Sequence, residues 1–195
     1  MAQLGAPGPV YRHIANAHDT RSEWTYGNTV AELPDGNIVV SFRNISTLVV
    51  VNRRSGAITW KVGPSMLASQ HAATPLPNGN LLIFGNGTDW SDGGLPYLRV
   101  LEIDPRVNTV VWQYQDRPAV NFFSPLISNG QRLWNGNTLI NEGIFGRLFE
   151  VTNDGDVVWE YVNPFFGGSP DAQTSSVFRA YRYTEQEIAR ARSSG

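Results

Sequence analysis

The sequence has no cysteine, which excludes disulfides, thiolate metal sites and cysteine nucleophiles. Lys61 is the only lysine, and the net charge of -2 leaves no basic face for nucleic acid. The longest apolar runs, such as 48–51 and 157–159, are too short to span a bilayer, and residues 1–9 lack the pattern of a signal peptide. We therefore expect no nucleic-acid partner, no membrane partner and, by default, a cytoplasmic location.

Metal-binding and nucleotide-binding motifs are also missing. The three histidines, His13, His18 and His71, are too scattered to form a zinc triad, and the aspartates share no calcium-loop spacing. The sequence contains no Gly-x-Ser-x-Gly elbow and no phosphate-binding glycine loop. We expect neither a metal nor a cofactor.

A short motif recurs three times, as Leu-Pro-Asp-Gly-Asn at 33–37, Leu-Pro-Asn-Gly-Asn at 76–80 and Leu-Trp-Asn-Gly-Asn at 133–137. Asp-Gly and Asn-Gly between apolar stretches are the strongest short signal for a β-hairpin. In a type I′ turn both central residues have positive φ, and these dipeptides predict such turns. Each motif therefore predicts a hairpin at the same place in a repeated unit.

Each unit contains further strand-like runs after its turn. The first two runs in each unit are 38–42 and 47–52, 81–84 and 98–104, and 138–140 and 147–152. The last strand-like run of each unit ends on a tryptophan, and these residues are Trp60, Trp112 and Trp159. Four-stranded units at intervals of roughly 40–50 residues are typical of propeller blades, and the tryptophans then belong to the packing between blades. A sandwich of about 12 short strands fits the strand count but not the phase of the repeat.

The predicted fold is all-β: a β-propeller-like array of at least three four-stranded antiparallel blades with a short C-terminal helix. Its parts are an N-terminal segment at 1–22, blades at 23–183 and a helix or tail at 184–195, where Thr184 and Glu187 form a capping box. Closed propellers normally need four to eight blades. We expect the chain either to form a homo-oligomer or to close by pairing strands at Val10–Ile14 and Val177–Tyr183.

Seven segments carry a resemblance to a known family. They are Glu23–Asn28, Ser41–Asn44, Gln70–Ala72, Asn135–Ile140, Gly146–Thr152, Trp159–Pro164 and Phe178–Tyr183. Together they resemble the arylsulfotransferase (aryl-sulfate sulfotransferase) family from about Glu23 to Arg192. The resemblance implies a six-bladed propeller of which this chain matches the C-terminal half.

The resemblance also implies chemistry at the central channel of the propeller. Family members move a sulfuryl group from an aryl sulfate to another phenol, using histidines and arginine and no nucleotide sulfate donor. Histidine can attack sulfur, and arginine can neutralise the sulfonate oxygens. This chain departs from the pattern, with Tyr26 and Leu126 where the family has histidines and Ala72 where an aspartate would orient His71.

The candidate site residues come from this comparison and, for Glu142, from the ability of a carboxylate to transfer protons. Those that handle protons or carry the transferred group are His71, Tyr26 and Glu142, and those that contact the substrate are Arg43, Arg99, Arg132 and Leu126. Convergence of Tyr26, Arg43, His71, Arg99 and Leu126 on one pocket is the observation that would test this assignment, and the sequence alone does not supply that geometry. The expected ligand is a small, aromatic molecule.

Three functions remain open at this point. The first is an arylsulfotransferase-like propeller with an altered site that binds or converts a small aromatic or apolar molecule by acid–base chemistry. The second is a non-catalytic binding or assembly module. The third is an aryl-sulfate sulfotransferase that uses His71. Because leucine cannot carry a sulfuryl group, we expect little sulfotransfer unless histidine is restored at 26 and 126 and aspartate introduced at 72.

Overall fold

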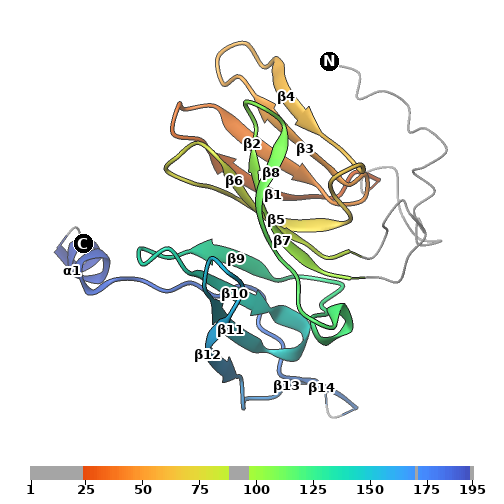
Figure 1. The fold of residues 1–195 in the computed structure, drawn as a ribbon, viewed down its shortest axis with the longest axis vertical. Helices are drawn as coiled ribbons and strands as arrows, with labels where there is room; N and C mark the ends of the chain where they lie inside the picture. The colour runs from red at the N-terminus through yellow and green to blue at the C-terminus, as the bar shows by residue number, and fades with distance from the viewer. Residues whose placement is uncertain (1–23, 88–96, 170, 194–195) are drawn as a thin grey trace.

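The computed structural model describes residues 24–87, 97–169 and 171–193. Three four-stranded antiparallel sheets follow one another along the chain, and each is built from consecutive strands (Figure 1). The predicted all-β array of four-stranded blades is thus confirmed. The expected strand at Val10–Ile14 lies outside the described residues.

In each sheet the strand order in space is the order in the sequence. The first sheet contains β1 (Gly27–Glu32), β2 (Ile38–Phe42), β3 (Thr47–Val51) and β4 (Ile58–Val62). The second contains β5 (Gln70–Pro75), β6 (Leu81–Gly85), β7 (Arg99–Asp104) and β8 (Thr109–Tyr114). The third contains β9 (Asn129–Arg132), β10 (Thr138–Glu142), β11 (Arg147–Val151) and β12 (Val157–Val162).

The three repeated motifs form the turn between the first and second strand of each sheet. Within each motif only the glycine has a positive φ, with values of 82°, 86° and 87° at Gly36, Gly79 and Gly136. The glycine N–H donates to the leucine carbonyl three residues earlier, as from Gly36 to Leu33 at 2.9 Å. The predicted type I′ turn is therefore wrong, because the loop is longer and places only its glycine in the left-handed region.

The tryptophans that end the repeats occupy equivalent places, as the sequence predicts. Trp60 lies opposite Val50, Trp112 opposite Glu102 and Trp159 opposite Glu150, and in each sheet the register shifts at the next residue. A β-bulge of this kind bends the strand and increases its twist. The repeat is therefore one of three-dimensional structure as well as of sequence.

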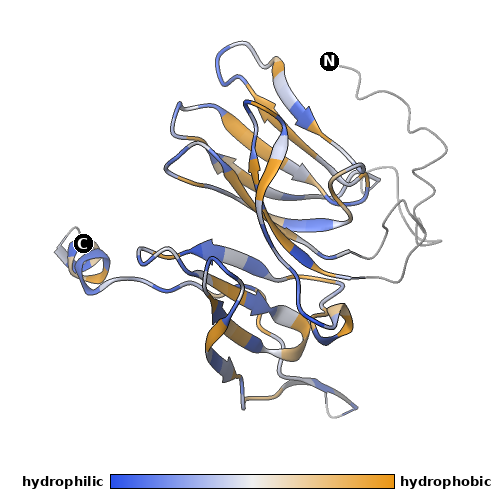
Figure 2. Cartoon of the chain, viewed as in Figure 1, coloured by the Kyte–Doolittle hydropathy of each residue, from blue (hydrophilic) through white to orange (hydrophobic). Residues whose placement is uncertain are grey.

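The hydrophobic core lies between the sheets. One cluster joins the first two sheets through residues such as Leu48, Val62 and Leu101, and a second joins the second and third through Phe84, Phe122 and Phe149, among others. Apolar residues run along these strands in Figure 2. The first strands are also neighbours, since β1 contacts β5 and β5 contacts β9. Face-to-face sheets with adjacent first strands are the arrangement of propeller blades.

Among the described residues, the 3₁₀ helix η2 (Ala119–Asn121) connects the second and third sheets. A second 3₁₀ helix, η3 (Gly143–Phe145), connects β10 to β11, and the hairpin of β13 (Gly167–Ser169) and β14 (Ala172–Thr174) follows the third sheet. No helix among the described residues is long and apolar enough to cross a membrane.

The segment Val177–Tyr183 follows this hairpin and is not a regular strand, contrary to expectation. It lies along β9, where the side-chain amide of Asn129 donates to the Ala180 carbonyl at 2.8 Å and accepts from its N–H at 2.9 Å. Gln131 makes the same pair of bonds with Arg182, at 2.9 and 2.7 Å. Side-chain amides thus replace the backbone ladder of a sheet.

Helix α1 (Glu185–Ser193) ends the described chain, close to its predicted bounds. The Glu187 N–H donates to Thr184 Oγ1 at 3.1 Å, and the Thr184 N–H donates to Glu187 Oε2 at 2.7 Å. The predicted capping box is confirmed.

The packing between the second and third sheets predicts a large loss of stability in Phe149→Ala. Phe149 is fully buried, and its ring meets those of Phe122 and Tyr114 with centroids 5.6 and 5.7 Å apart. Truncation of such a ring should lower the free energy of unfolding by about 3–5 kcal/mol, measured by urea denaturation. Phe165→Ala, the same change at an exposed ring, should cost less than about 1 kcal/mol. Equal effects of the two changes would contradict the blade packing.

Candidate functional site

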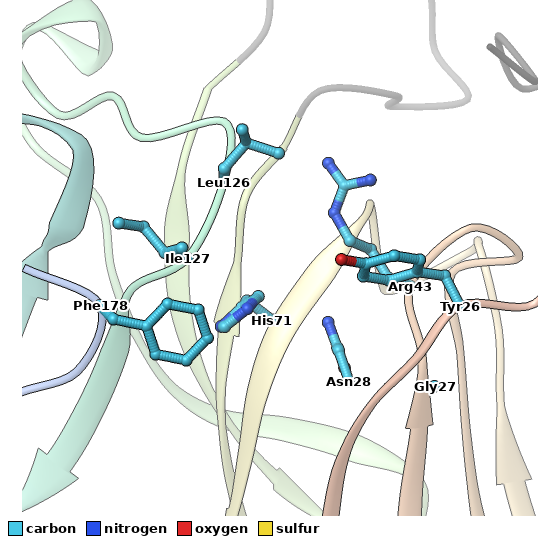
Figure 3. Close-up of a pocket in the computed structure, with 8 residues that line it drawn as sticks. All are labelled: Tyr26, Gly27, Asn28, Arg43, His71, Leu126, Ile127 and Phe178. Atoms are coloured by element: carbon cyan, nitrogen blue, oxygen red, sulfur yellow. The ribbon is translucent and has the colours of Figure 1, made fainter. Parts of the chain in front are cut away.

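A cavity of about 300 Å³ opens where the first strands of the sheets begin. Four of the residues predicted from the sequence line it together: Tyr26, Arg43, His71 and Leu126 (Figure 3). The remaining lining residues are Gly27, Asn28, Ile127 and Phe178. The cavity therefore combines one cation and one imidazole with aromatic and aliphatic walls.

The phase of the repeat explains why these residues meet. Asn28, His71 and Ser128 are each the fifth residue before the leucine of a turn motif. Because the first strands of the sheets are neighbours, these equivalent positions come together at one end of the array. Residues at this phase of every repeat are the natural place for a shared site.

His71 is buried, and its ring is held in one orientation. Its Nδ1 lies 3.1 Å from the carbonyl oxygen of Ser128, and its ring meets Phe178 edge-on with centroids 5.4 Å apart. A carbonyl can only accept, so Nδ1 carries the proton and the lone pair is on Nε2. Ala72 supplies no carboxylate to orient the imidazole, and the backbone carbonyl of Ser128 orients it instead.

The surroundings of His71 keep its ring neutral. Burial lowers the pKa of His71 from 6.5 to about 4, and the positive charges of Arg179 and Arg43 act in the same direction. The hydrogen bond to Ser128 opposes these effects but does not outweigh them. The cavity is thus an electropositive place that contains a neutral imidazole at pH 7.

Arg43 connects two walls of the cavity. Its Nη2 donates to the Pro125 carbonyl at 3.1 Å, and its Nη1 lies 3.4 Å from Asn44 Oδ1. Its backbone N–H donates to the Tyr26 carbonyl at 3.0 Å. These bonds hold the Arg43 guanidinium beside the cavity and fix the neighbouring loops.

Tyr26 and Leu126 are the two residues at whose positions the sequence resemblance implies histidines. Both side chains are half exposed, and both line the cavity. Tyr26 has φ of 47°, a conformation that non-glycine residues adopt rarely and that often occurs at functional sites. At these two positions the cavity therefore has a phenol and an aliphatic group, where the resemblance implies imidazoles.

Sequence reasoning missed Asn28, Ile127 and Phe178. Asn28 Nδ2 donates to the Gln70 carbonyl at 2.9 Å, which joins β1 to β5. Asn28 is at the same repeat phase as His71, and Phe178 precedes Arg182 by the interval that separates Ser128 from Arg132. The repeat phase was the signal that would have found them.

Three candidate residues lie outside this cavity. Glu142 accepts from the Phe123 N–H at 2.7 Å and pairs with Arg147 at 3.3 Å, and burial raises its pKa. Arg132 pairs with Glu102 at 2.8 Å between the second and third sheets. Arg99, on β7, lies over the Tyr97 ring at 5.4 Å and is not part of the cavity wall.

In the described part of the chain, no group of three or more histidine or acidic side chains is arranged to hold a metal ion.

Fold and cavity together define a β-propeller-like protein with a pocket of small-molecule size at the end where its first strands begin. The family model Arylsulfotransferase (ASST) matches residues 12–164, so the chain belongs to the arylsulfotransferase family. The resemblance seen in the sequence is thereby confirmed. No curated protein matches the chain.

Solved structures support the fold. A Bacteroides caccae protein of unknown function is similar with a TM-score of 0.53 and 18% identity, over 70% of this chain and 45% of that one. Virginiamycin B lyase from Staphylococcus aureus matches with a TM-score of 0.51 and 13% identity, over 72% of this chain and 42% of the lyase. Hydrazine synthase from Kuenenia stuttgartiensis matches with a TM-score of 0.53 and 14% identity, over 82% of this chain and 43% of the synthase chain. The chain spans less than half the length of each of these proteins.

The low pKa of His71 predicts a pH dependence of stability. In the unfolded chain His71 titrates near 6.5, so between pH 6.5 and about 4 the unfolded state binds more protons than the folded state. The titration of His71 should therefore lower the free energy of unfolding as the pH falls through this window, by at most about 3 kcal/mol, and the fall should be smaller by that amount in His71→Gln.

The titration itself is measured from the C2–H proton resonance of His71, assigned by its loss in His71→Gln. We expect a midpoint near 4 in the folded protein. A midpoint near 6.5, or the same pH dependence of stability in parent and variant, would show that the ring is not held neutral by burial.

Proposed function

We propose that the cavity binds a small aromatic anion of the aryl-sulfate type. The observation that carries this is the convergence of Arg43 and a neutral His71 with the apolar walls Leu126, Ile127 and Phe178 in a cavity of about 300 Å³. A guanidinium pairs strongly with sulfonate or phenolate oxygens, and the apolar walls suit an aromatic ring. An anionic ligand would also offset the positive charges of Arg179 and Arg43, which add to the larger effect of burial in lowering the pKa of His71.

A second candidate function is sulfuryl transfer, which the orientation of His71 favours. Nε2 would attack the sulfur, forming an N–S bond while the S–O bond breaks and the phenolate leaves with the electron pair. Arg43 would neutralise the sulfonate oxygens during this step. The oxygen of a second phenol would then attack the sulfur as the N–S bond breaks, and the proton of this phenol would pass to the phenolate released in the first step. With Tyr26 and Leu126 at the family's histidine positions, acid–base assistance is missing, and we expect turnover near background.

Binding is tested by calorimetric titration with 4-nitrophenyl sulfate and with 4-nitroanisole, a neutral compound with the same ring. We expect the sulfate to bind more tightly, and Arg43→Gln to weaken it about 10- to 100-fold, because a hydrogen bond to a charged group contributes about 1.5–3 kcal/mol. Arg43→Lys should retain part of the affinity. Arg53→Gln, which removes an exposed partner of Glu32, should leave affinity unchanged. Equal affinity for both compounds would contradict an anion site.

Turnover is read in the same samples from the absorbance of released 4-nitrophenol, with phenol as acceptor. The double variant Tyr26→His, Leu126→His should exceed the parent, and His71→Ala in that background should abolish the gain. Aspartate at position 72 is omitted, because the Ala72 side chain packs in the core between the sheets. Rapid turnover by the parent, lost in His71→Ala, would replace the binding proposal with the sulfotransferase function.

We also infer self-association through the third sheet. Tyr114 and Tyr161 take equivalent places two residues after their tryptophans, yet Tyr114 is 4% exposed and Tyr161 is 42% exposed. Every residue of β12 is exposed, and Trp159 stacks on Tyr161 at 11°. A second copy would supply a sheet to cover this face.

Sedimentation velocity over a range of concentrations tests this association. The parent should have a mass above that of one chain, and Tyr161→Ser should shift it toward a single chain by removing apolar contact area. Ile188→Ser, at a similarly exposed position on α1, should leave the mass unchanged. A single-chain mass at all concentrations would defeat the inference.

A further inference from the structure

Between the second and third sheets, one arginine is held by a set of polar and aromatic side chains that we call the arginine clamp. Arg132 lies over the Trp112 ring at 4.4 Å and donates to Glu102 Oε2 at 2.8 Å. The other oxygen of Glu102 accepts from Asn78 at 3.1 Å and from Asn80 at 2.6 Å, both from the turn motif. The arginine thus fills the space between two sheets and has its charge neutralised there.

The same clamp recurs where the third sheet meets the C-terminal segment. Arg182 lies over the Trp159 ring at 5.0 Å and pairs with Glu150. Asn135 and Asn137, from the third turn motif, donate to the other oxygen of Glu150 at 3.0 and 2.7 Å. Two successive junctions therefore place a guanidinium on a tryptophan.

The junction between the first and second sheets lacks both charged members of the clamp. Val50 lies opposite Trp60, where Glu102 lies opposite Trp112. Pro75 directly precedes the turn leucine, the position that Arg132 holds in the third sheet. The buried Trp60 Nε1 has no hydrogen-bond partner among the described residues, whereas Trp112 Nε1 donates to the Asn153 carbonyl at 2.8 Å.

A cavity of about 310 Å³ is present at this first junction. Val50 and Trp60 line it, together with Leu33, Pro34 and Pro105. It is separate from the cavity that contains His71, because the two share no lining residue. The cavity therefore adjoins Trp60, and the equivalents of Trp60 at the other two junctions, Trp112 and Trp159, each have an arginine over the ring.

Negative charge at this junction comes from the turn. Asp35 stands where the other motifs have Asn78 and Asn135, and it lines the cavity. Arg106 also lines the cavity, but its guanidinium is paired with Asp104, with bonds of 2.8 and 2.7 Å. Asp35 therefore supplies a carboxylate at the asparagine position of the clamp, where its two oxygens accept from the Asn37 N–H at 3.0 Å and from the Asn37 side-chain amide at 2.9 Å.

We propose that this cavity binds a small molecule with a planar guanidinium or amidinium head on an apolar stem. The head stacks on Trp60, as Arg132 and Arg182 stack on their tryptophans, and Asp35 neutralises its charge. Leu33, Pro34 and Pro105 contact the stem. This site does not depend on the function proposed for the His71 cavity.

Binding is tested by NMR, from the indole N–H resonances of the protein during titration with butylguanidinium. The Trp60 resonance, assigned by its loss in Trp60→Phe, should shift and saturate at millimolar ligand. The resonances of Trp112 and Trp159 should not move, because arginine side chains already cover those rings. Butylammonium, which cannot stack, and butylurea, which has no charge, should each bind at least about threefold more weakly.

Two variants separate the proposed contacts. Asp35→Asn gives the turn the residue that both other motifs have, so it should fold normally and weaken binding by about two- to fivefold. The triple variant Asp35→Asn, Val50→Glu, Pro75→Arg rebuilds the clamp inside the cavity. It should abolish binding and move the Trp60 resonance toward the environment of Trp112.

The proposal is overturned if the Trp60 shift fails to saturate or if Trp112 and Trp159 shift equally. It is also overturned if butylurea binds as well as butylguanidinium, or if Asp35→Asn leaves the affinity unchanged. Should the triple variant fail to fold, Asp35→Asn and the ligand series still decide the outcome.

Discussion

The structure depends on the burial of both faces of twisted four-stranded sheets. A sheet of this kind has two apolar faces and can bury them only against neighbouring sheets, so the blades pack face to face around a central axis. The second sheet shows the result, since Leu81 and Leu82, adjacent residues that face opposite sides, are both fully or almost fully buried. Along β12, which no further four-stranded sheet covers among the described residues, the equivalent side chains are exposed.

Stacking of the blades also creates the candidate site. Because the first strands of the sheets lie together, one residue from each repeat reaches the same end of the array. Three repeats contribute Asn28, His71 and Ser128 at that point, and the differences between them determine the chemistry. The histidine obtains its tautomer from the serine carbonyl one blade away, and its neutrality from burial.

The repeat and its turns could be predicted because they depend on local sequence. Asp-Gly and Asn-Gly mark the hairpins, and the recurring tryptophans mark the last strand of each sheet, as found. The prediction of a type I′ turn was wrong because the dipeptide does not determine the length of the loop. The prediction of a strand at Val177–Tyr183 was wrong because the segment's backbone hydrogen-bonds to the side-chain amides of Asn129 and Gln131, which are far away in the sequence.

The site was predictable in part. Tyr26, Arg43, His71 and Leu126 meet in the cavity, and the family resemblance had selected them. Arg132 was selected in the same way but belongs to a clamp between blades, and Glu142 is engaged by Arg147. Sequence shows that a residue is charged but not which carboxylate or ring it meets. The Ser128 carbonyl that orients His71 is a backbone atom and leaves no trace in the residue types.

The most direct test of this account is the tautomer of His71 in the folded protein at pH 7. Long-range ¹⁵N–¹H NMR correlation distinguishes a protonated ring nitrogen from one with a free lone pair. We expect Nδ1 to be protonated and Nε2 to be free, because the Ser128 carbonyl can only accept a hydrogen bond. A ring protonated on Nε2 instead, or on both nitrogens, would contradict the proposed role of His71.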